Sequence, residues 1–251
     1  MLKARIIPCL LIKDGRCVKG KGFKDYIDVG SPVSSAKIYE AQGADELIVI
    51  NLCQETFHGD FIDLVGEISY ECYMPITVGG GIRNLTDMQT LFKNGADRIL
   101  LNTAPLNNPN IIKQAALEYG SQAVVISIDY TYRHGAYPLV VNKSSAANSL
   151  DPIEWALSCQ KLGAGEILFT LVDNDGKKNG LDLDYIEKIS NKLTIPIVPS
   201  GGVGSLDDIA QVLLRGKVSG VGVGSFLNFS DQSVIKIHSY LRQQGISTRL
   251  S

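Results

Sequence analysis

Short apolar runs rich in β-branched residues alternate along the chain with longer segments of helical period. Eight such runs predict strands: Arg5–Leu11, Glu46–Asn51, Ile76–Val78, Arg98–Leu101, Ala123–Asp129, Glu166–Thr170, Ile197–Pro199 and Gly220–Val223. Their apolar character is continuous rather than alternating, which is typical of parallel strands covered on both faces. The alternation of strands with helices indicates βαβ units.

Six segments between these runs predict helices: Pro32–Gln42, Asn84–Lys93, Pro109–Tyr119, Pro152–Leu162, Asp184–Lys192 and Leu206–Leu214. Ser31 before Pro32 and Asn108 before Pro109 are each an N-cap residue followed by a proline, which is favoured at the first helical position. The segment Tyr130–Asn148 is the longest between elements. Its turn at residues 133–135 predicts a hairpin over one end of the fold.

The chain repeats itself at a spacing of about half its length. Gly43-Ala-Asp-Glu-Leu-Ile matches Gly163-Ala-Gly-Glu-Ile-Leu, Pro75-Ile-Thr-Val-Gly-Gly-Gly-Ile matches Pro196-Ile-Val-Pro-Ser-Gly-Gly-Val, and Asn102-Thr103 falls against Gly224-Ser225. Two four-stranded halves that close into one (β/α)₈ TIM barrel fit this repeat best, since such barrels typically take ~250 residues. A doubly wound open sheet is the alternative. No linker divides the halves, so residues 1–251 are expected to form one domain.

Composition excludes several classes of protein. The chain has 24 Lys and Arg against 26 Asp and Glu, without long runs of like charge, which disfavours nucleic acid and anionic membranes as partners. The apolar stretch near the N-terminus is too short for a signal or membrane segment, so a cytoplasmic protein is expected. Five scattered cysteines without a CxxC pair disfavour disulfides and zinc, and neither metal nor cofactor is expected. The three histidines are expected at the surface.

Glycines and small polar residues follow four of the predicted strands. Barrel enzymes place their active site at this end of the strands, and glycine lets the backbone approach an anion closely. These sites are Gly79-Gly80-Gly81, Asn102-Thr103, Gly201-Gly202 and Gly224-Ser225. Tight turns without a ligand are the alternative. Because the sites repeat in both halves, they predict two phosphate cradles that hold a substrate with a phosphate at each end.

Two carboxylates lie at the same predicted end. Asp129 follows the fifth strand and Asp175 lies after the sixth, where either is a candidate for acid–base chemistry or a loop-capping residue. Lys19 lies in a glycine-punctuated loop after the first strand and is either a cation at the site or solvated. No Ser-His-Asp or Cys-His arrangement is present.

Four charged residues lie at the opposite ends of the strands. Arg5, Glu46, Arg98 and Glu166 each begin an apolar run, and the two glutamates are repeat equivalents. A solvated rim is the usual role for such charges. A ring of paired charges that closes the bottom of the barrel is the alternative.

The chain resembles the HisF family, the cyclase subunit of imidazole glycerol phosphate synthase, over essentially its whole length. The resemblance rests on collinear motifs: Arg5-Ile-Ile-Pro-Cys-Leu, Val18-Lys19-Gly20, Gly43-Ala-Asp-Glu46, Thr77-Val-Gly-Gly-Gly-Ile-Arg83, Gly95-Ala-Asp, Asn102-Thr103, Gly120 and Ser121, Gly163-Ala-Gly-Glu166, Asp175-Gly176, Ser200-Gly-Gly202 and Arg249-Leu250. It implies a lyase-type reaction in which ammonia from a HisH-like glutaminase attacks a ribulosyl formimino aminoimidazole carboxamide substrate with two phosphates. The products are imidazole glycerol phosphate and a ribonucleotide.

The resemblance also assigns residues. It implies one phosphate on Gly81, Asn102 and Thr103 and the other on Asp175, Gly176, Gly202, Gly224 and Ser225. It makes Asp129 an acid–base residue, with Lys19, Thr170 and Ser200 near the substrate. Arg5, Glu46, Arg98 and Glu166 would be the gate through which ammonia enters, with the glutaminase at the N-terminal face of the barrel. Family members commonly have Lys in place of Arg98.

The chain departs from the family at the end of the first strand. The family has Cys-Leu-Asp there and this chain has Cys9-Leu10-Leu11, so Asp129 has lost its repeat equivalent. Asn51 replaces a second family Asp. Two interpretations follow. One is a working synthase in which Asp129 acts alone or is helped by a neighbouring group. The other is a diverged paralogue that conducts ammonia to an amidotransferase in bacterial surface-sugar amidination. A HisA-type isomerase is a third, less favoured, because it has no need of the charged ring.

Overall fold

The computed structural model describes residues 3–53, 59–133, 137–141 and 150–249. Eight parallel strands form a (β/α)₈ barrel, as the sequence predicted: β1 (Arg5–Lys13), β4 (Leu47–Asn51), β5 (Ile76–Gly79), β6 (Arg98–Leu101), β7 (Val124–Arg133), β9 (Glu166–Leu171), β10 (Ile197–Ser200) and β11 (Gly220–Val223). The strands pair in order from β11 through β1 to β10. Ser219 N donates to Ile197 O at 3.1 Å, so β11 lies beside β10 and the barrel closes.

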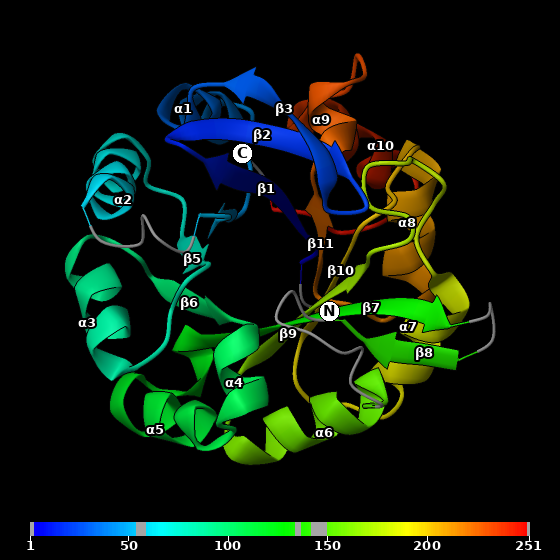
Figure 1. Ribbon diagram of the computed structural model, residues 1–251. Coiled ribbons are helices and arrows are strands. Elements are labelled where there is room, and N and C mark those ends of the chain that lie inside the picture. Colours follow the sequence, from blue (N-terminus) through cyan, green and yellow to red (C-terminus); the bar gives the residue numbers. More distant parts are fainter. Residues whose placement is uncertain (1–2, 54–58, 134–136, 142–149, 250–251) are drawn as a thin grey trace.

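Helices surround the barrel on the outside (Figure 1). They are α1 (Pro32–Ala41), α2 (Asp60–Glu71), α3 (Leu85–Lys93), α5 (Asn110–Tyr119), α6 (Pro152–Leu162), α7 (Leu183–Ser190), α8 (Leu206–Arg215) and α10 (Val234–Gln243), with the short α4 (Thr103–Asn107), α9 (Ser225–Asn228) and the 3₁₀ turn η2 (Ser121–Ala123). The six predicted helices agree with the structure to within two residues at either end. The sequence analysis did not identify α2 and α10.

Side-chain caps, predicted at Ser31 and Asn108 and found also at Asp151, account for several helix starts. Ser31 Oγ accepts from Ser34 N ahead of Pro32, and Asp151 Oδ1 accepts from Ile153 N at 2.8 Å at the start of α6. Helix α5 begins one residue later than expected, at Asn110, and the side chain of Asn108 still accepts from its backbone N–H. Side chains therefore satisfy the backbone groups that a helix start leaves open.

The core has two layers. Ile7, Ile48, Leu100, Val125, Leu168 and Val198 form an apolar cluster inside the barrel and are almost completely buried. A larger apolar cluster lies between the strands and the helices. Neighbouring residues of one strand divide between the two layers, as Ile6 and Ile7 do, because successive side chains point to opposite faces. Because the residues of this inner cluster are apolar, polar functional groups are expected at the two ends of the barrel.

The two halves begin in the same way, with a strand that continues into an antiparallel hairpin. Strand β1 pairs with β2 (Arg16–Lys21), which pairs with β3 (Lys24–Gly30). Strand β7 pairs with β8 (Tyr137–Val140), which confirms the predicted hairpin, although residues 134–136 and 142–149 lie outside the described residues. The expectation that Lys19 lies in a loop was wrong, because it lies within β2.

The registers of the strands also follow the repeat. Leu11 on β1 pairs with Ile50 on β4, and Asp129 on β7 pairs with Thr170 on β9. Ile50 and Thr170 are themselves repeat equivalents. Leu11 and Asp129 therefore occupy equivalent positions in the two halves, which is what the sequence alignment of the halves predicted.

Candidate functional site

A cavity of about 840 Å³ lies at the carboxyl ends of the strands. We call it the mouth cavity. All of the residues predicted to take part in catalysis or phosphate binding line it: Lys19, Gly81, Asn102, Thr103, Asp129, Thr170, Asp175, Gly176, Ser200, Gly202, Gly224 and Ser225. Its size is that of a typical small-molecule site. Residues from most of the chain thus line one cavity, because the carboxyl ends of all barrel strands meet at the same end of the barrel.

Several glycines of the mouth cavity are required by their conformation or surroundings. Gly81 has φ +85° and Gly202 has φ +114°, which side chains rarely adopt. A Cβ atom at Gly202 would collide with the carbonyl oxygen of Gly180, and one at Gly176 would collide with that of Gly20. These glycines therefore keep backbone close to the cavity where a side chain would displace it.

Asp129 ends the inward-facing row of β7 and is held by its neighbours. Asn102 Nδ2 donates to Asp129 Oδ2 at 2.6 Å, and Ser127 Oγ lies 3.3 Å from Oδ1. Asn102 comes from the loop after β6 that was predicted to hold phosphate. The carboxylate and that loop are thus directly connected. Nothing in the sequence pointed to Ser127.

Lys19 and Asp175 lie in the interior of the mouth cavity. Lys19 is 4% exposed, and its Nζ donates to Cys9 O. Burial lowers the pKa of Lys19, although the charge of Asp175 opposes this shift. Burial raises the pKa of Asp175, and the charge of Lys19 opposes that shift. Burial thus disfavours the charged form of both groups, and each charge favours the other.

Leu11 lines the same cavity at the position equivalent to Asp129. Its side chain is half-buried and offers neither donor nor acceptor. Asn51, the second departure from the family, is buried, and its Oδ1 accepts from Cys53 N at 2.9 Å. The β1 and β4 side of the cavity therefore carries no carboxylate at these two positions, whereas β7 carries Asp129.

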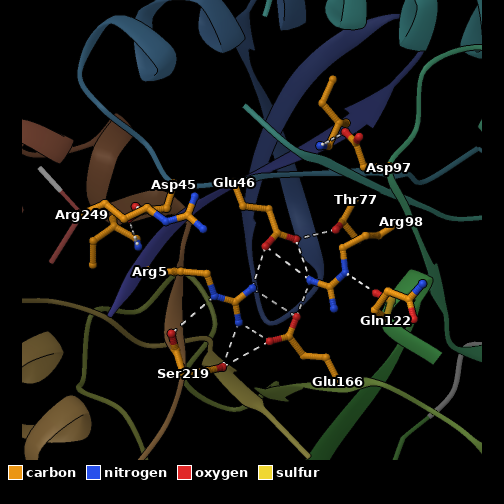
Figure 2. Close-up of polar contacts among 12 residues, drawn as sticks. Arg5, Asp45, Glu46, Thr77, Asp97, Arg98, Gln122, Glu166, Ser219 and Arg249 are labelled. Carbon is orange, nitrogen blue, oxygen red and sulfur yellow. Dashed lines mark hydrogen bonds and ion pairs between the residues drawn. The ribbon is translucent and has the colours of Figure 1, made fainter. Parts of the chain in front are cut away.

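A second group of polar residues closes the other end of the barrel. Arg5, Glu46, Arg98 and Glu166 form a ring of alternating charge, which we call the charged ring (Figure 2). Arg5 Nη1 lies 2.8 Å from Glu46 Oε2, Arg98 Nη1 lies 3.1 Å from Glu46 Oε1, and both arginines also bind Glu166. Their side chains are at most 17% exposed. A solvated rim is therefore excluded, and the paired ring is found.

The ring stabilises the charges of its members. Burial would raise the pKa of Glu166, but hydrogen bonds and the charges of Arg5 and Arg98 hold it below its ordinary value. Burial would lower the pKa of Arg5, but Glu166 and Glu46 raise it. Glu166 and Arg5 therefore stay charged in the buried ring because their oppositely charged partners lie beside them.

Three residues that the sequence analysis missed fix the charged ring. Ser219 Oγ lies 2.8 Å from Arg5 Nη2 and 3.2 Å from Glu166 Oε1 (Figure 2). Thr77 Oγ1 donates to Glu46 Oε1 at 2.5 Å. The backbone O of Gln122 accepts from Arg98 Nε at 3.0 Å. The last contact needs an arginine, since lysine has no Nε. Thr77 begins the family motif Thr77-Val-Gly-Gly-Gly-Ile-Arg83, but nothing in the sequence indicated its contact with Glu46.

His238 was expected at the surface and is instead buried. It lies on α10, 3.0 Å from Gly43 O and 3.6 Å from Asp45 Oδ2. Asp45 Oδ2 also accepts from Ile6 N at 2.8 Å, next to Arg5. The expectation was wrong because His238 lies on the face of α10 that packs into the core, beside Ile237 and Leu241. The other two histidines lie outside the described residues.

Within the described part of the chain, no group of three His, Cys, Asp or Glu side chains is arranged to hold a metal ion. No described helix is long and apolar enough to cross a bilayer. Cys17, Cys72 and Cys159 are buried, and the described cysteines are free thiols.

Comparison with known proteins agrees with the geometry. Residues 5–232 match the family described as histidine biosynthesis protein. The chain is also 39% identical over 254 residues to the imidazole glycerol phosphate synthase subunit HisF of Clostridium botulinum (strain 657 / Type Ba4), a match that covers 100% of both chains. With its barrel, mouth cavity and charged ring, the chain belongs to the HisF family of histidine biosynthesis proteins.

Proposed function

We propose that this chain is the cyclase subunit of a glutamine-dependent imidazole glycerol phosphate synthase. Ammonia released by a HisH-like glutaminase enters through the charged ring, crosses the barrel and reacts in the mouth cavity. The substrate is a ribulosyl formimino aminoimidazole carboxamide with two phosphates, and the product is imidazole glycerol phosphate. The proposal places the protein in the cytoplasm, as one domain without a metal or cofactor.

One observation carries this proposal: the two polar sites lie at opposite ends of the same barrel. The mouth cavity holds glycine-lined backbone from both halves, at Gly81 and at Gly202, as a substrate with two phosphates requires. The charged ring is built from the starts of the strands whose carboxyl ends line that cavity. A HisA-type isomerase would need the first site but not the second.

The N-terminal face is the proposed docking surface for the glutaminase. The charged ring lies at this face, so a partner seated over it delivers ammonia without loss to water. Arg98 and Arg5 both bridge Glu46 and Glu166, so at least one arginine has to move for a molecule to pass. Arg98 replaces the family's lysine, and its planar head makes an additional contact to Gln122 O.

Leu11 favours a second candidate function. Here the barrel is a paralogue that conducts ammonia to an amidotransferase of surface-polysaccharide sugar amidination. The charged ring is complete, whereas Leu11 and Asn51 leave the β1 and β4 wall of the mouth cavity without a carboxylate. Losing a positioned acid or base typically lowers a rate by about 10² to 10⁴.

Ammonium-supported turnover separates the two functions. The isolated protein is incubated with the two-phosphate precursor and excess ammonium salt, beside the Leu11→Asp variant, and loss of the precursor is followed. Turnover by the unchanged protein supports the synthase. No turnover by the unchanged protein, with activity gained in Leu11→Asp, rejects the synthase and supports the ammonia-conducting paralogue.

A further inference from the structure

Tyr26 is a polar group in the mouth cavity that neither the sequence analysis nor the proposed phosphate sites use. It lies on β3, in the hairpin that follows Leu11, and its half-buried side chain lines the same cavity as Leu11, Lys19 and Asp129. The ring packs against Gly20 so closely that a Cβ atom there would lie 2.9 Å from Tyr26 Cδ1. Gly20 thus provides the space in which the ring is seated.

The hairpin that carries Tyr26 is fixed to the opposite half of the barrel. Gly22 N donates to Asp175 O at 2.9 Å, and the backbone of Phe23 hydrogen-bonds to the Asp175 carboxylate. The carbonyl oxygen of Gly20 lies where Gly176 would carry a side chain. These contacts hold the phenol of Tyr26 at the cavity near Asp175, rather than on a freely moving loop.

The surroundings keep the phenol protonated. Burial raises the pKa of Tyr26, and the negative charges of Asp175 and Asp129 raise it further. Asp175 and Asp129 line the same cavity as the phenol. At neutral pH the side chain is a proton donor, which is the property that an acid catalyst needs and that Leu11 lacks.

We propose that Tyr26 is the second acid–base residue of this chain and replaces the carboxylate lost at Leu11. This inference rests on the proposed synthase function. Asp129 and Tyr26 would then act as the pair, one from each half of the barrel. The mechanism would then still use two groups, although β7 carries the carboxylate of Asp129 and the equivalent position on β1 carries the apolar Leu11.

The proton transfers balance without an oxidant or reductant. The lone pair of ammonia forms a bond to an electrophilic carbon of the substrate, and the proton that the attacking nitrogen loses goes to Asp129. The same nitrogen also replaces the oxygen of the ribulosyl ketone, which leaves as water, and this condensation closes the imidazole ring. A carbon–nitrogen bond of the substrate breaks, the leaving nitrogen keeps the electron pair, and it takes the hydroxyl proton of Tyr26. The phenolate regains a proton from water and Asp129 releases one, which restores both groups.

The test is Tyr26→Phe, which removes the hydroxyl and keeps the ring against Gly20. With the two-phosphate precursor and excess ammonium, kcat is expected to fall by about 10² to 10⁴, with KM changed less than about threefold. Tyr70→Phe is the matched control, because Tyr70 is 85% exposed on α2. Thermal melting of both variants checks that they are folded.

A rescue experiment distinguishes catalysis from a structural role. Leu11→Asp is added to Tyr26→Phe, which restores the family's carboxylate, and at least a tenfold recovery of kcat is expected. Equal kcat in Tyr26→Phe and the unchanged protein overturns the role of Tyr26 and leaves the synthase function standing. No turnover by the unchanged protein overturns both the synthase function and this inference.

Discussion

Glu166 is the member of the charged ring whose loss has the clearest expected effect. Its side chain is 3% exposed and binds Arg5, Arg98 and Ser219. Glu166→Gln keeps the volume and removes the charge, so two guanidinium groups are left with Glu46 as their carboxylate. Removing one partner of a buried ion pair costs about 3–5 kcal/mol, and we expect about 3 kcal/mol because the arginine side chains are 16–17% exposed.

Thermal melting measures this loss. For a chain of this size, about 3 kcal/mol lowers Tm by roughly 6–12 °C. The control is Glu187→Gln on α7, which weakens the surface contact to Arg215 at 3.4 Å, where the side chains are 46% and 48% exposed. Such pairs contribute about 0–1 kcal/mol. Equal Tm values for the two variants would refute the argument that the charged ring is a buried, stabilising network.

The pH dependence of stability has a defined sign. The pKa of Glu166 is lowered in the folded protein from its ordinary value of 4.5. Its contribution is therefore fully present above pH 4.5 and is lost as the pH falls through the lowered folded value. The Tm difference between the unchanged protein and Glu166→Gln is expected to shrink in that acidic range. A difference that stays constant down to pH 3 would contradict the ionised state assigned to Glu166.

Two further predictions concern the mouth cavity. Asp129→Asn is expected to lower ammonium-supported kcat by about 10² to 10⁴, since it removes the proposed proton acceptor; turnover equal to that of the unchanged protein would exclude Asp129 as the base. Gly202→Ala is expected to weaken binding of inorganic phosphate in calorimetry by at least tenfold, because its φ is +114° and the new Cβ would collide with Gly180 O. Unchanged binding would show that this backbone does not hold the anion.

Local patterns in the sequence were sufficient for the strands and most helices. The buried strands are continuous apolar runs, and their ends agree with the structure to within two residues except at β7, which runs on to Arg133. Burial on both faces leaves no polar alternation, so such runs are readable without tertiary information. The internal repeat likewise identified Leu11 and Asp129 as equivalents, and the strand registers agree.

The hairpin β2–β3 and the helix α10 were not found, for different reasons. Glycine and lysine residues interrupt the period-two pattern of β2, and its pairing with β3 shifts register between Cys17 and Val18 and between Lys19 and Lys21. Strand β2 forms because β1 continues beyond the barrel and offers it a partner to pair with. The burial of His238 against Gly43 O depends on how α10 packs on the barrel, which the sequence does not show.

The sequence by itself determined the (β/α)₈ architecture, the candidate residues at each end of the strands and the missing carboxylate at Leu11. Only the tertiary structure decided that the four strand-start charges are a buried ring rather than a solvated rim, and that Tyr26 faces the mouth cavity near Asp175. The physical reason is that charge and period are local properties of a chain. Burial and pairing depend on barrel closure, which brings together residues as far apart as Arg5 and Glu166.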